Sequence, residues 1–202
     1  MILDKLSVHF LRSFMRITGG TLRSRTLNTS GFQGIRPTTD RARETIFNIL
    51  LNYRDIEGMH VLDLCAGTGA LSFEALSRGA ASAVLIEKNR RNCLLLAEIA
   101  KSLNIQENMR LICADALKAA PMLAPLQFDC IFTDPPYAAK LVNPLFQTIA
   151  ASNLSREGTI FVAEHAASEV VLLQKGWEKL TARKFGETIV DFFCCISSPQ
   201  TP

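Results

Sequence analysis

The chain has 202 residues, of which 48% are hydrophobic, and this is enough to bury one good-sized core in a single main domain. The sequence has no run of about 18 apolar residues, and its N-terminus lacks the basic, apolar and small-residue order of a secretory signal. We therefore expect a soluble, cytoplasmic protein with no membrane partner.

Positive charge is concentrated near the N-terminus. Residues 1–54 contain nine Lys and Arg against three Asp and Glu, a net charge of +6, whereas residues 55–202 contain thirteen against sixteen, a net charge of −3. A basic arm on a weakly acidic body favours contact with a phosphate backbone. A merely solvated basic face is the alternative.

The cysteines and histidines do not predict a metal site. The cysteines show no CxxC spacing, and the three histidines stand apart from them. We therefore expect no metal, and we expect the thiols to be reduced and to pack as small hydrophobic groups. The six cysteines are Cys65, Cys93, Cys113, Cys130, Cys194 and Cys195.

In chain order, the first expected element is a small basic arm. Residues 1–14 show no clear turn, cap or motif, and we treat them as an extension of uncertain role. The segment 16–27 contains Gly19-Gly20 between short runs with branched and apolar residues, which predicts a β-hairpin. We assign residues 15–36 to this arm, and its candidate RNA-binding residues are Arg16, Arg23 and Arg25.

The main domain, residues 37–198, is expected to be α/β, with a tail at 199–202. A helix follows Pro37, because Thr38, Thr39 or Asp40 can cap it and apolar residues then recur at helical spacing. From His60 onward, short apolar runs alternate with helix-length segments, which indicates parallel strands joined by crossover helices. Strands are expected near 60–65, 82–87, 109–113, 128–133 and 158–163, and helices near 69–78, 89–103, 115–120 and 141–152. The segments 177–184 and 188–196, on either side of Gly186, predict a closing antiparallel hairpin.

The first strand leads into a candidate cofactor turn. Residues 61–71 run from an apolar strand through Gly67-Thr68-Gly69 into a helix, and glycines there permit a tight turn close to a ligand. The third glycine of the dinucleotide pattern is absent, and Asp63 faces the predicted pocket. A cationic ligand without phosphate fits this turn better than a pyrophosphate does. S-adenosylmethionine is such a ligand.

Acidic residues also follow the second and third strands. Glu87 closes the second apolar run, where a carboxylate can accept both ribose hydroxyls. Asp115, followed by Ala116, comes after the third strand, at the level of the adenine amino group. Each feature alone is equally typical of a strand–helix turn or a helix cap. Together with Asp63, they place three carboxylates at the ends of three consecutive strands, in one crevice.

The fourth strand ends in the candidate catalytic motif Asp134-Pro135-Pro136-Tyr137. Two prolines stiffen the backbone after the strand. The turn can then hold the Asp134 side chain and a neighbouring carbonyl as acceptors for an amino group, which aims the nitrogen lone pair at a methyl donor. Tyr137 can stack on an extruded base. The alternative is a capped, proline-stiffened loop with Tyr137 as packing.

On these residues the sequence resembles class I methyltransferases that modify amino groups, whose [DN]PP[YF] motif ends the fourth strand. More narrowly, residues 16–20, 36–44 and 63–71 resemble the RsmD family of bacterial 16S rRNA guanine-N2 methyltransferases. The likeness runs from about Met15 to Ile196 without a large gap, and it leaves residues 1–14 outside. It implies a seven-stranded Rossmann-like sheet and a guanine in small-subunit RNA as the substrate.

The resemblance also implies a role for residues 36–44, which would close over the methionine end of the cofactor. Thr38, Thr39 and Arg41 would then lie near the active site as cofactor-binding residues. Beside the Pro-Thr-Thr turn, the residues Arg36, Arg41 and Arg43 are also candidate phosphate contacts. A capped amphipathic helix with solvent-facing charges is the alternative for this segment.

Two other functions remain open at this stage. The first is a DNA adenine or cytosine amino-methyltransferase, against which the absence of an evident target-recognition domain argues. The second is a non-catalytic RNA-binding module that retains the cofactor fold, against which the intact Asp134–Tyr137 motif argues. The oligomeric state, and the choice between naked rRNA and the assembled small ribosomal subunit, do not follow from the residues.

Overall fold

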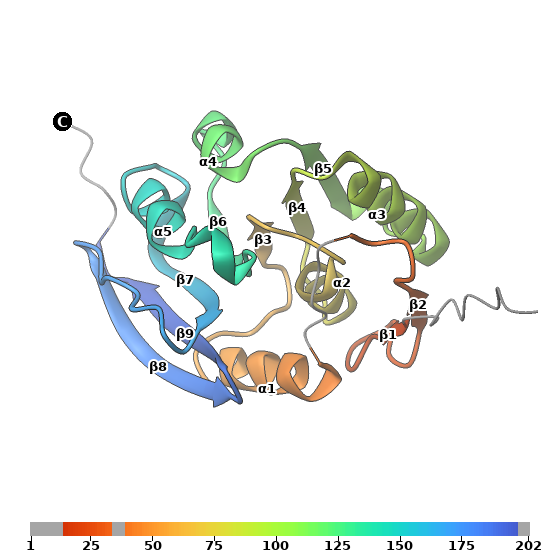
Figure 1. The fold of residues 1–202 in the computed structure, drawn as a ribbon, viewed down its shortest axis with the longest axis horizontal. Coiled ribbons are helices and arrows are strands. Elements are labelled where there is room, and N and C mark those ends of the chain that lie inside the picture. The colour runs from red at the N-terminus through yellow and green to blue at the C-terminus, as the bar shows by residue number, and fades with distance from the viewer. Residues whose placement is uncertain (1–13, 34–38, 198–202) are drawn as a thin grey trace, which may run out of the picture.

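The computed structural model describes residues 14–33 and 39–197 and is built around a seven-stranded sheet (Figure 1). The order across the sheet is β5-β4-β3-β6-β7-β9-β8, with the pairs from β5 to β7 parallel and the last two pairs antiparallel. This confirms the predicted α/β class and the closing hairpin. The strands of the sheet are β3 (His60–Asp63), β4 (Ser82–Glu87), β5 (Met109–Cys113), β6 (Phe128–Thr133), β7 (Ser155–Ala166), β8 (Trp177–Phe185) and β9 (Thr188–Cys195).

Helices cover both faces of the sheet, and alternate residues of each strand feed two separate cores. Val61, Phe132 and Val162 belong to the core under the first three helices, whereas Leu62, Ile131 and Phe161 belong to the core under the last two. Burial on both faces explains why these strands read as continuous apolar runs. The helices are α1 (Asp40–Leu51), α2 (Ala70–Ser77), α3 (Arg90–Leu103), α4 (Ala116–Ala119) and α5 (Val142–Ala150), with short 3-10 turns η1 (Gln106–Asn108), η2 (Ala120–Leu123) and η3 (Tyr137–Ala139).

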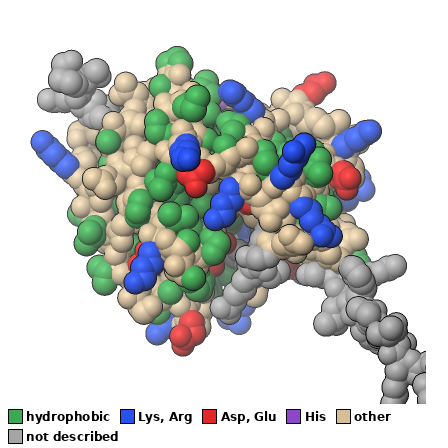
Figure 2. Space-filling view, turned by 45° about the horizontal axis from the view of Figure 1, so that its top comes forward, with side chains coloured by type: hydrophobic (Ala, Val, Ile, Leu, Met, Phe, Trp, Pro, Cys, Tyr) green, Lys and Arg blue, Asp and Glu red, His purple; other side chains and the backbone are tan. Residues whose placement is uncertain are grey.

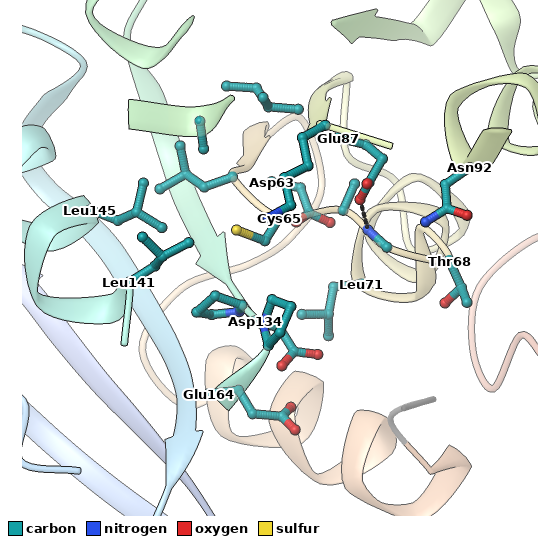
Figure 3. Close-up of a pocket in the computed structure, with 18 of the residues that line it drawn as sticks. Asp63, Cys65, Thr68, Leu71, Glu87, Asn92, Asp134, Leu141, Leu145 and Glu164 are labelled. Atoms are coloured by element: carbon teal, nitrogen blue, oxygen red, sulfur yellow. Dashed lines mark hydrogen bonds between the residues drawn. The ribbon is translucent and has the colours of Figure 1, made fainter. Parts of the chain in front are cut away.

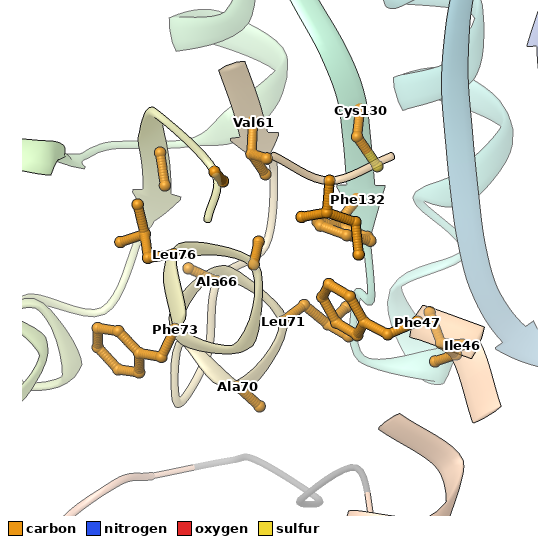
Figure 4. Packing of buried hydrophobic residues seen from close by; sticks show 14 of the residues in the cluster. Ile46, Phe47, Val61, Ala66, Ala70, Leu71, Phe73, Leu76, Cys130 and Phe132 are labelled. Carbon is orange, nitrogen blue, oxygen red and sulfur yellow. The ribbon is translucent and has the colours of Figure 1, made fainter. Parts of the chain in front are cut away.

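The helix α1 packs beneath the main domain through its apolar stripe. Phe47 is fully buried, and its ring lies 5.9 Å from that of Phe132 on β6. Figure 4 shows Phe47 reaching toward Leu71 of α2 as well. Fully burying one such side chain contributes about 1.5–3 kcal/mol, so the stripe fixes α1 against the sheet. Its N-terminus is thereby held close to the carboxyl ends of the strands.

The basic arm is a hairpin with short paired segments. β1 (Phe14–Arg16) pairs antiparallel with β2 (Thr26–Asn28), as predicted, but the turn is longer than a tight Gly-Gly turn. Gly20 instead allows close packing, because a Cβ on this residue would lie 1.7 Å from the Ser77 carbonyl oxygen. Thr21 donates its N–H to the same carbonyl at 2.7 Å. The loop is therefore shaped by α2 and not by the hairpin alone.

The observed strands and helices lie close to the predicted ranges, with one clear difference in β7. The strand was expected at 158–163, but it continues to Ala166 because residues 160–166 pair with β9. Glu164 and His165 carry no strand signal of their own. Among the described residues, no helix is long and apolar enough to span a bilayer.

Candidate active site

A cavity of about 590 Å³ opens at the carboxyl ends of the strands, where the strand order reverses between β3 and β6 (Figure 3). In open α/β sheets, this reversal point is the place where ligands bind. The lining includes residues from the ends of β3, β4, β6 and β7 and from the start of β9. Residues far apart in the sequence therefore meet here.

Asp63, the last residue of β3, lies at the bottom of this cavity. Its side chain is only 2% exposed, and Oδ2 accepts a hydrogen bond of 2.8 Å from the Ser72 hydroxyl. Burial raises the pKa of Asp63 to about 7, against the weaker opposing effects of the Ser72 and Cys65 hydrogen bonds. The negative charge of Glu87 raises this pKa further. Among the described residues, the partners that act on this carboxyl group include no cation.

The turn after β3 separates the roles of its two glycines. Gly67 lines the cavity and donates its N–H to Glu87 Oε2 at 3.0 Å. Gly69 does not line it; this residue begins α2 with φ +75°, and a Cβ there would lie 2.5 Å from the Phe73 ring. Gly69 is therefore required by the backbone and packing. Gly67 also has a positive φ, +55°, and it can in addition approach a ligand directly.

Glu87 holds the second strand end in place. Its Oε1 accepts the Asn89 N–H at 2.7 Å, and its Oε2 accepts the N–H of Gly67. A carboxylate has about four lone-pair positions, so both oxygens retain acceptor capacity on the cavity side. Figure 3 shows the Glu87 side chain across the cavity from Asp134.

Asp115 and Ala116 line the cavity beyond Glu87. The Asp115 side chain caps α4 by accepting the Leu117 N–H at 3.1 Å. The capping role that the sequence left open is therefore real, and it coexists with a place in the cavity wall.

The Asp134–Tyr137 motif forms the wall that faces these carboxylates. All four of its residues line the cavity; Pro135 is buried and Asp134 is half-buried. The Tyr137 hydroxyl forms a hydrogen bond with the Thr188 hydroxyl at the start of β9, and it lies 3.5 Å from Glu164 Oε1. These contacts fix the Tyr137 ring at the cavity rim.

Three acidic side chains of the cavity act on the Cys65 thiol. Burial raises the pKa of the Cys65 thiol to about 12, and the charges of Asp63, Asp134 and Glu87 raise it further. Cys65 is consequently a neutral thiol and not a nucleophile. Because three carboxyl groups from three strands act on one atom, the cavity is suited to a cationic ligand.

Only part of the segment expected to cover the cofactor can be placed. Thr39 lines the cavity and caps α1, where its Oγ1 accepts the Ala42 N–H at 3.2 Å. Arg41 is exposed and does not line the cavity. Thr38 and Arg36 lie outside the described residues.

The expected phosphate contact of Arg43 needs correction. Its side chain is only 1% exposed, and its guanidinium donates to Glu74 Oε2 at 3.1 Å and to Asp40 Oδ1 at 2.8 Å. It also donates to the Arg16 carbonyl oxygen. Glu74 is fully buried in α2 and needs a cationic partner there. Arg43 is therefore a structural residue that joins α1, α2 and the arm.

Glu74 also accepts hydrogen bonds from the arm itself. The Thr18 N–H donates to its Oε2 at 2.8 Å, and the Thr18 hydroxyl donates to its Oε1 at 2.7 Å. These two bonds attach the arm to α2. Hydrogen bonds and the charge of Arg78 outweigh burial and keep the pKa of Glu74 below its ordinary value.

The remaining arm arginines are on the surface. Arg23 and Arg25 are exposed, and Arg16, also exposed, forms an ion pair of 3.3 Å with Asp40. Figure 2 shows Lys and Arg side chains spread across the visible face of the molecule and not gathered in one patch. The exposed arginines remain candidate phosphate contacts.

Sequence reasoning missed several residues that line the cavity. Glu164 on β7 is the most significant, because it follows an apolar strand just as Glu87 does. The rule that found the other strand-end carboxylates would have found it too. Phe185 and Thr188 were missed because only the folding back of β8 and β9 brings them to the cavity.

Comparisons with known proteins agree with this site. The family model described as Conserved hypothetical protein 95 matches residues 15–194. The chain is 34% identical over 164 residues to Ribosomal RNA small subunit methyltransferase D of Escherichia coli (strain K12), with 81% of each chain covered. It is 31% identical over 161 residues to the protein of the same name from Buchnera aphidicola, covering 80% of this chain and 83% of the relative.

A solved structure agrees as well. The protein yhhF from Escherichia coli, a proposed methyltransferase, superimposes with a TM-score of 0.79 at 29% identity. The superposition covers 92% of this chain and 100% of that one.

Proposed function

The chain belongs to the family described as Conserved hypothetical protein 95, and from this membership we propose that it is an S-adenosylmethionine-dependent methyltransferase acting on the exocyclic N2 of a guanine in 16S rRNA. The resemblance to the RsmD family that the sequence indicated is confirmed. The observation that carries the proposal is the Asp134–Tyr137 motif, which faces a deep, negatively charged cavity across the strand reversal.

The residues of the cavity fit the proposed cofactor. S-adenosylmethionine carries positive charge at its sulfonium and ammonium groups, and Asp63 is a carboxyl group whose pKa is raised by burial, so that a cationic group beside it would favour its ionised form. Glu87 and Asp115 are the candidates for holding the ribose and the adenine, with Gly67 and Ala116 close beside them. When bound, the cofactor supplies an electrophilic methyl group.

Asp134 has the central role on the substrate side. Its carboxylate can accept an N–H of the base amine, and the stiff proline turn can present a backbone carbonyl as a second acceptor. Both contacts orient the nitrogen lone pair toward the cofactor side of the cavity, which is catalysis by positioning. The amine is cationic once methylated, and Asp134 Oδ can then take its surplus proton.

Tyr137 supplies a stacking surface for the target base. Its hydroxyl is fixed by Thr188, so the ring stands at the rim with little freedom. Stacking on an aromatic side chain contributes about 1–3 kcal/mol per base and is tolerant of sequence. The rest of the RNA requires phosphate contacts, and the exposed Arg16, Arg23 and Arg25 of the arm are our candidates.

The test compares two substitutions at the catalytic position in single-turnover methyl transfer to small-subunit RNA, with saturating cofactor. Asp134→Asn keeps a carbonyl oxygen at the same reach and should retain measurable activity. Asp134→Ala should lose about 100-fold or more. Equal inactivity of both variants would show that the negative charge itself is needed.

Duplex DNA, assayed in parallel, tests the other candidate substrate. Transfer to DNA adenine or cytosine, with none to the RNA, would overturn the proposed function. Cofactor binding without any transfer would favour the non-catalytic module.

A further inference from the structure

Glu164 stands beside the catalytic Asp134 because of the sheet register. Thr133, the last residue of β6, pairs with Ala163 of β7, and the next residues along the two chains are Asp134, just after β6, and Glu164 on β7. Neighbouring strands lie about 4.8 Å apart, and residues at matching positions point to the same side of the sheet. Both residues line the cavity, and Figure 3 shows their carboxylates near each other at its lower end.

The chemistry of the bases gives this second carboxylate a specific use. A guanine amine has a ring N–H, at N1, directly beside it on the Watson–Crick edge. The amines of adenine and cytosine have an unprotonated ring nitrogen at the corresponding place. An ionised carboxylate only accepts hydrogen bonds, so it attracts the guanine edge and repels the lone pair of the other two bases. Enzymes that extrude a base read this edge through such contacts.

We propose that Glu164 is the specificity-determining residue of this site, accepting the N1–H of the target guanine while Asp134 accepts its amine. The inference rests on the proposed function and deepens it by assigning how guanine is selected. Two acidic side chains that start about one strand spacing apart can converge on two adjacent donors of one base edge. Adenine and cytosine, the bases of the alternative DNA reaction, are excluded by the same contact.

The competing role for Glu164 is to position Tyr137, whose hydroxyl lies 3.5 Å from Oε1. That role would act through the phenol and would not depend on N1 of the base. The substitution Tyr137→Phe removes the hydroxyl and keeps the stacking ring, so it separates the two roles. Glu157→Gln is the matched control, because Glu157 is an exposed glutamate near the other end of the same strand.

The experiment first maps the guanine that the wild-type protein methylates in small-subunit RNA. Failure to methylate any guanine would overturn the proposed function itself. The mapped position is then replaced by 2-aminopurine, which keeps the 2-amino group but has an unprotonated N1. The ratio of kcat/KM for guanine to that for 2-aminopurine is measured for each variant.

The wild type and Glu157→Gln should share one ratio in favour of guanine. Glu164→Gln should lower this ratio about tenfold or more, because an amide can donate a hydrogen bond to the unprotonated N1 of 2-aminopurine. 2-Aminopurine also lacks the O6 group of guanine, but this difference affects all variants equally. Tyr137→Phe should keep the wild-type ratio, whatever its absolute rate. An unchanged ratio in Glu164→Gln, or an equal change in Tyr137→Phe, would overturn the proposal.

Binding provides a readout that does not need turnover. With S-adenosylhomocysteine present, the equilibrium affinities of the guanine RNA and the 2-aminopurine RNA should differ for the wild type and converge for Glu164→Gln. If Glu164→Gln is inactive on both RNAs, these affinities decide: convergence supports the assignment, and an unchanged difference rejects it.

Discussion

Asp63 and Asp129 lie on the neighbouring strands β3 and β6, and each is 2% exposed. They differ in the end of the sheet that they occupy: Asp63 ends β3 at the cavity, whereas Asp129 lies near the start of β6, at the opposite edge. Asp129 accepts hydrogen bonds from Arg54 at 2.8 Å, from the His60 N–H at 2.9 Å and from Arg156. Within the described ranges, Asp63 accepts hydrogen bonds from the neutral Ser72 hydroxyl and Cys65 backbone.

Despite equal exposure, the two carboxyl groups have opposite pKa shifts, because Asp63 is buried more deeply and Asp129 has cationic partners. Burial alone would raise the pKa of Asp129, but the hydrogen bonds from Arg156 and His60, with the charge of Arg54, bring it below the ordinary value. At Asp63 burial prevails, and the pKa rises to about 7. The negative charge of Asp129 is thus balanced by the arginines Arg54 and Arg156. Asp63 has neutral hydrogen-bond partners among the described residues, and its raised pKa in a cavity makes it a candidate for contact with a cationic ligand.

The largest expected effect of this difference is on stability at alkaline pH. A pKa that folding raises from 3.8 to about 7 means that the unfolding free energy falls as pH rises from about 4 to 7. The total is about 4 kcal/mol. Asp63→Asn removes this loss, so the ligand-free variant should be more stable than the wild type at pH 8.

Urea unfolding at about pH 4.5, near the start of this fall, and at about pH 8, beyond its end, measures the effect. The advantage of Asp63→Asn should be large at the higher pH and small at the lower one. An equal gain in unfolding free energy at both pH values would mean that folding does not raise the pKa of Asp63.

A smaller effect of opposite sign is expected at the other end of the sheet. The pKa of Asp129 is lowered on folding, so its contribution to stability is present above its unfolded pKa and is lost as pH falls through the folded value. Asp129→Asn should destabilise the protein by about 1–3 kcal/mol at pH 8. The cost is limited because the Arg54 and Arg156 side chains are 36% and 44% exposed and can turn toward water.

The destabilisation should begin to shrink below about pH 4, where the carboxyl of the unfolded chain becomes protonated, and should vanish below the lowered pKa of the folded protein. Cofactor affinity, measured by calorimetry, should be unchanged because Asp129 does not line the cavity. A weaker affinity would show that the two ends of the sheet are coupled.

The same contrast shows what could be predicted from the sequence. The strands and the strand-end carboxylates were predictable because apolar runs and their termini are local signals, and the topology brings such termini to one edge. Asp63, Glu87, Asp115 and Asp134 followed from this rule. Glu164 on β7 obeys the same rule, although it was not predicted.

The ionic contacts were not predictable in the same way. Arg43 lies in a segment rich in charge, and nothing local indicates that its partner is Glu74, 31 residues away in an otherwise apolar helix. The compensation of Asp129 by Arg54 and Arg156 also joins distant segments. Such ion pairs depend on how α1, α2 and the sheet pack against one another. A sequence pattern indicates the periodicity of one element, but it does not indicate which other element will lie beside it.

The smallest predicted effect tests whether a cationic ligand compensates Asp63. Below about pH 7 the buried carboxyl is protonated, and binding S-adenosylmethionine must expel this proton to gain an ionised partner. Affinity should therefore rise with pH and level off above about 7, with a gain of about tenfold between pH 6 and 8. Asp63→Asn cannot titrate, so its affinity should be nearly constant over this range. Asp129→Asn, which leaves Asp63 intact, should keep the wild-type dependence.

Calorimetry at each pH measures all three proteins against the same ligand, so titration of the ligand itself is common to them and cancels. If Asp63→Asn showed the same pH dependence as the wild type, another group would be responsible for the titration. Asp63 would then have no more role in cofactor binding than Asp129 has.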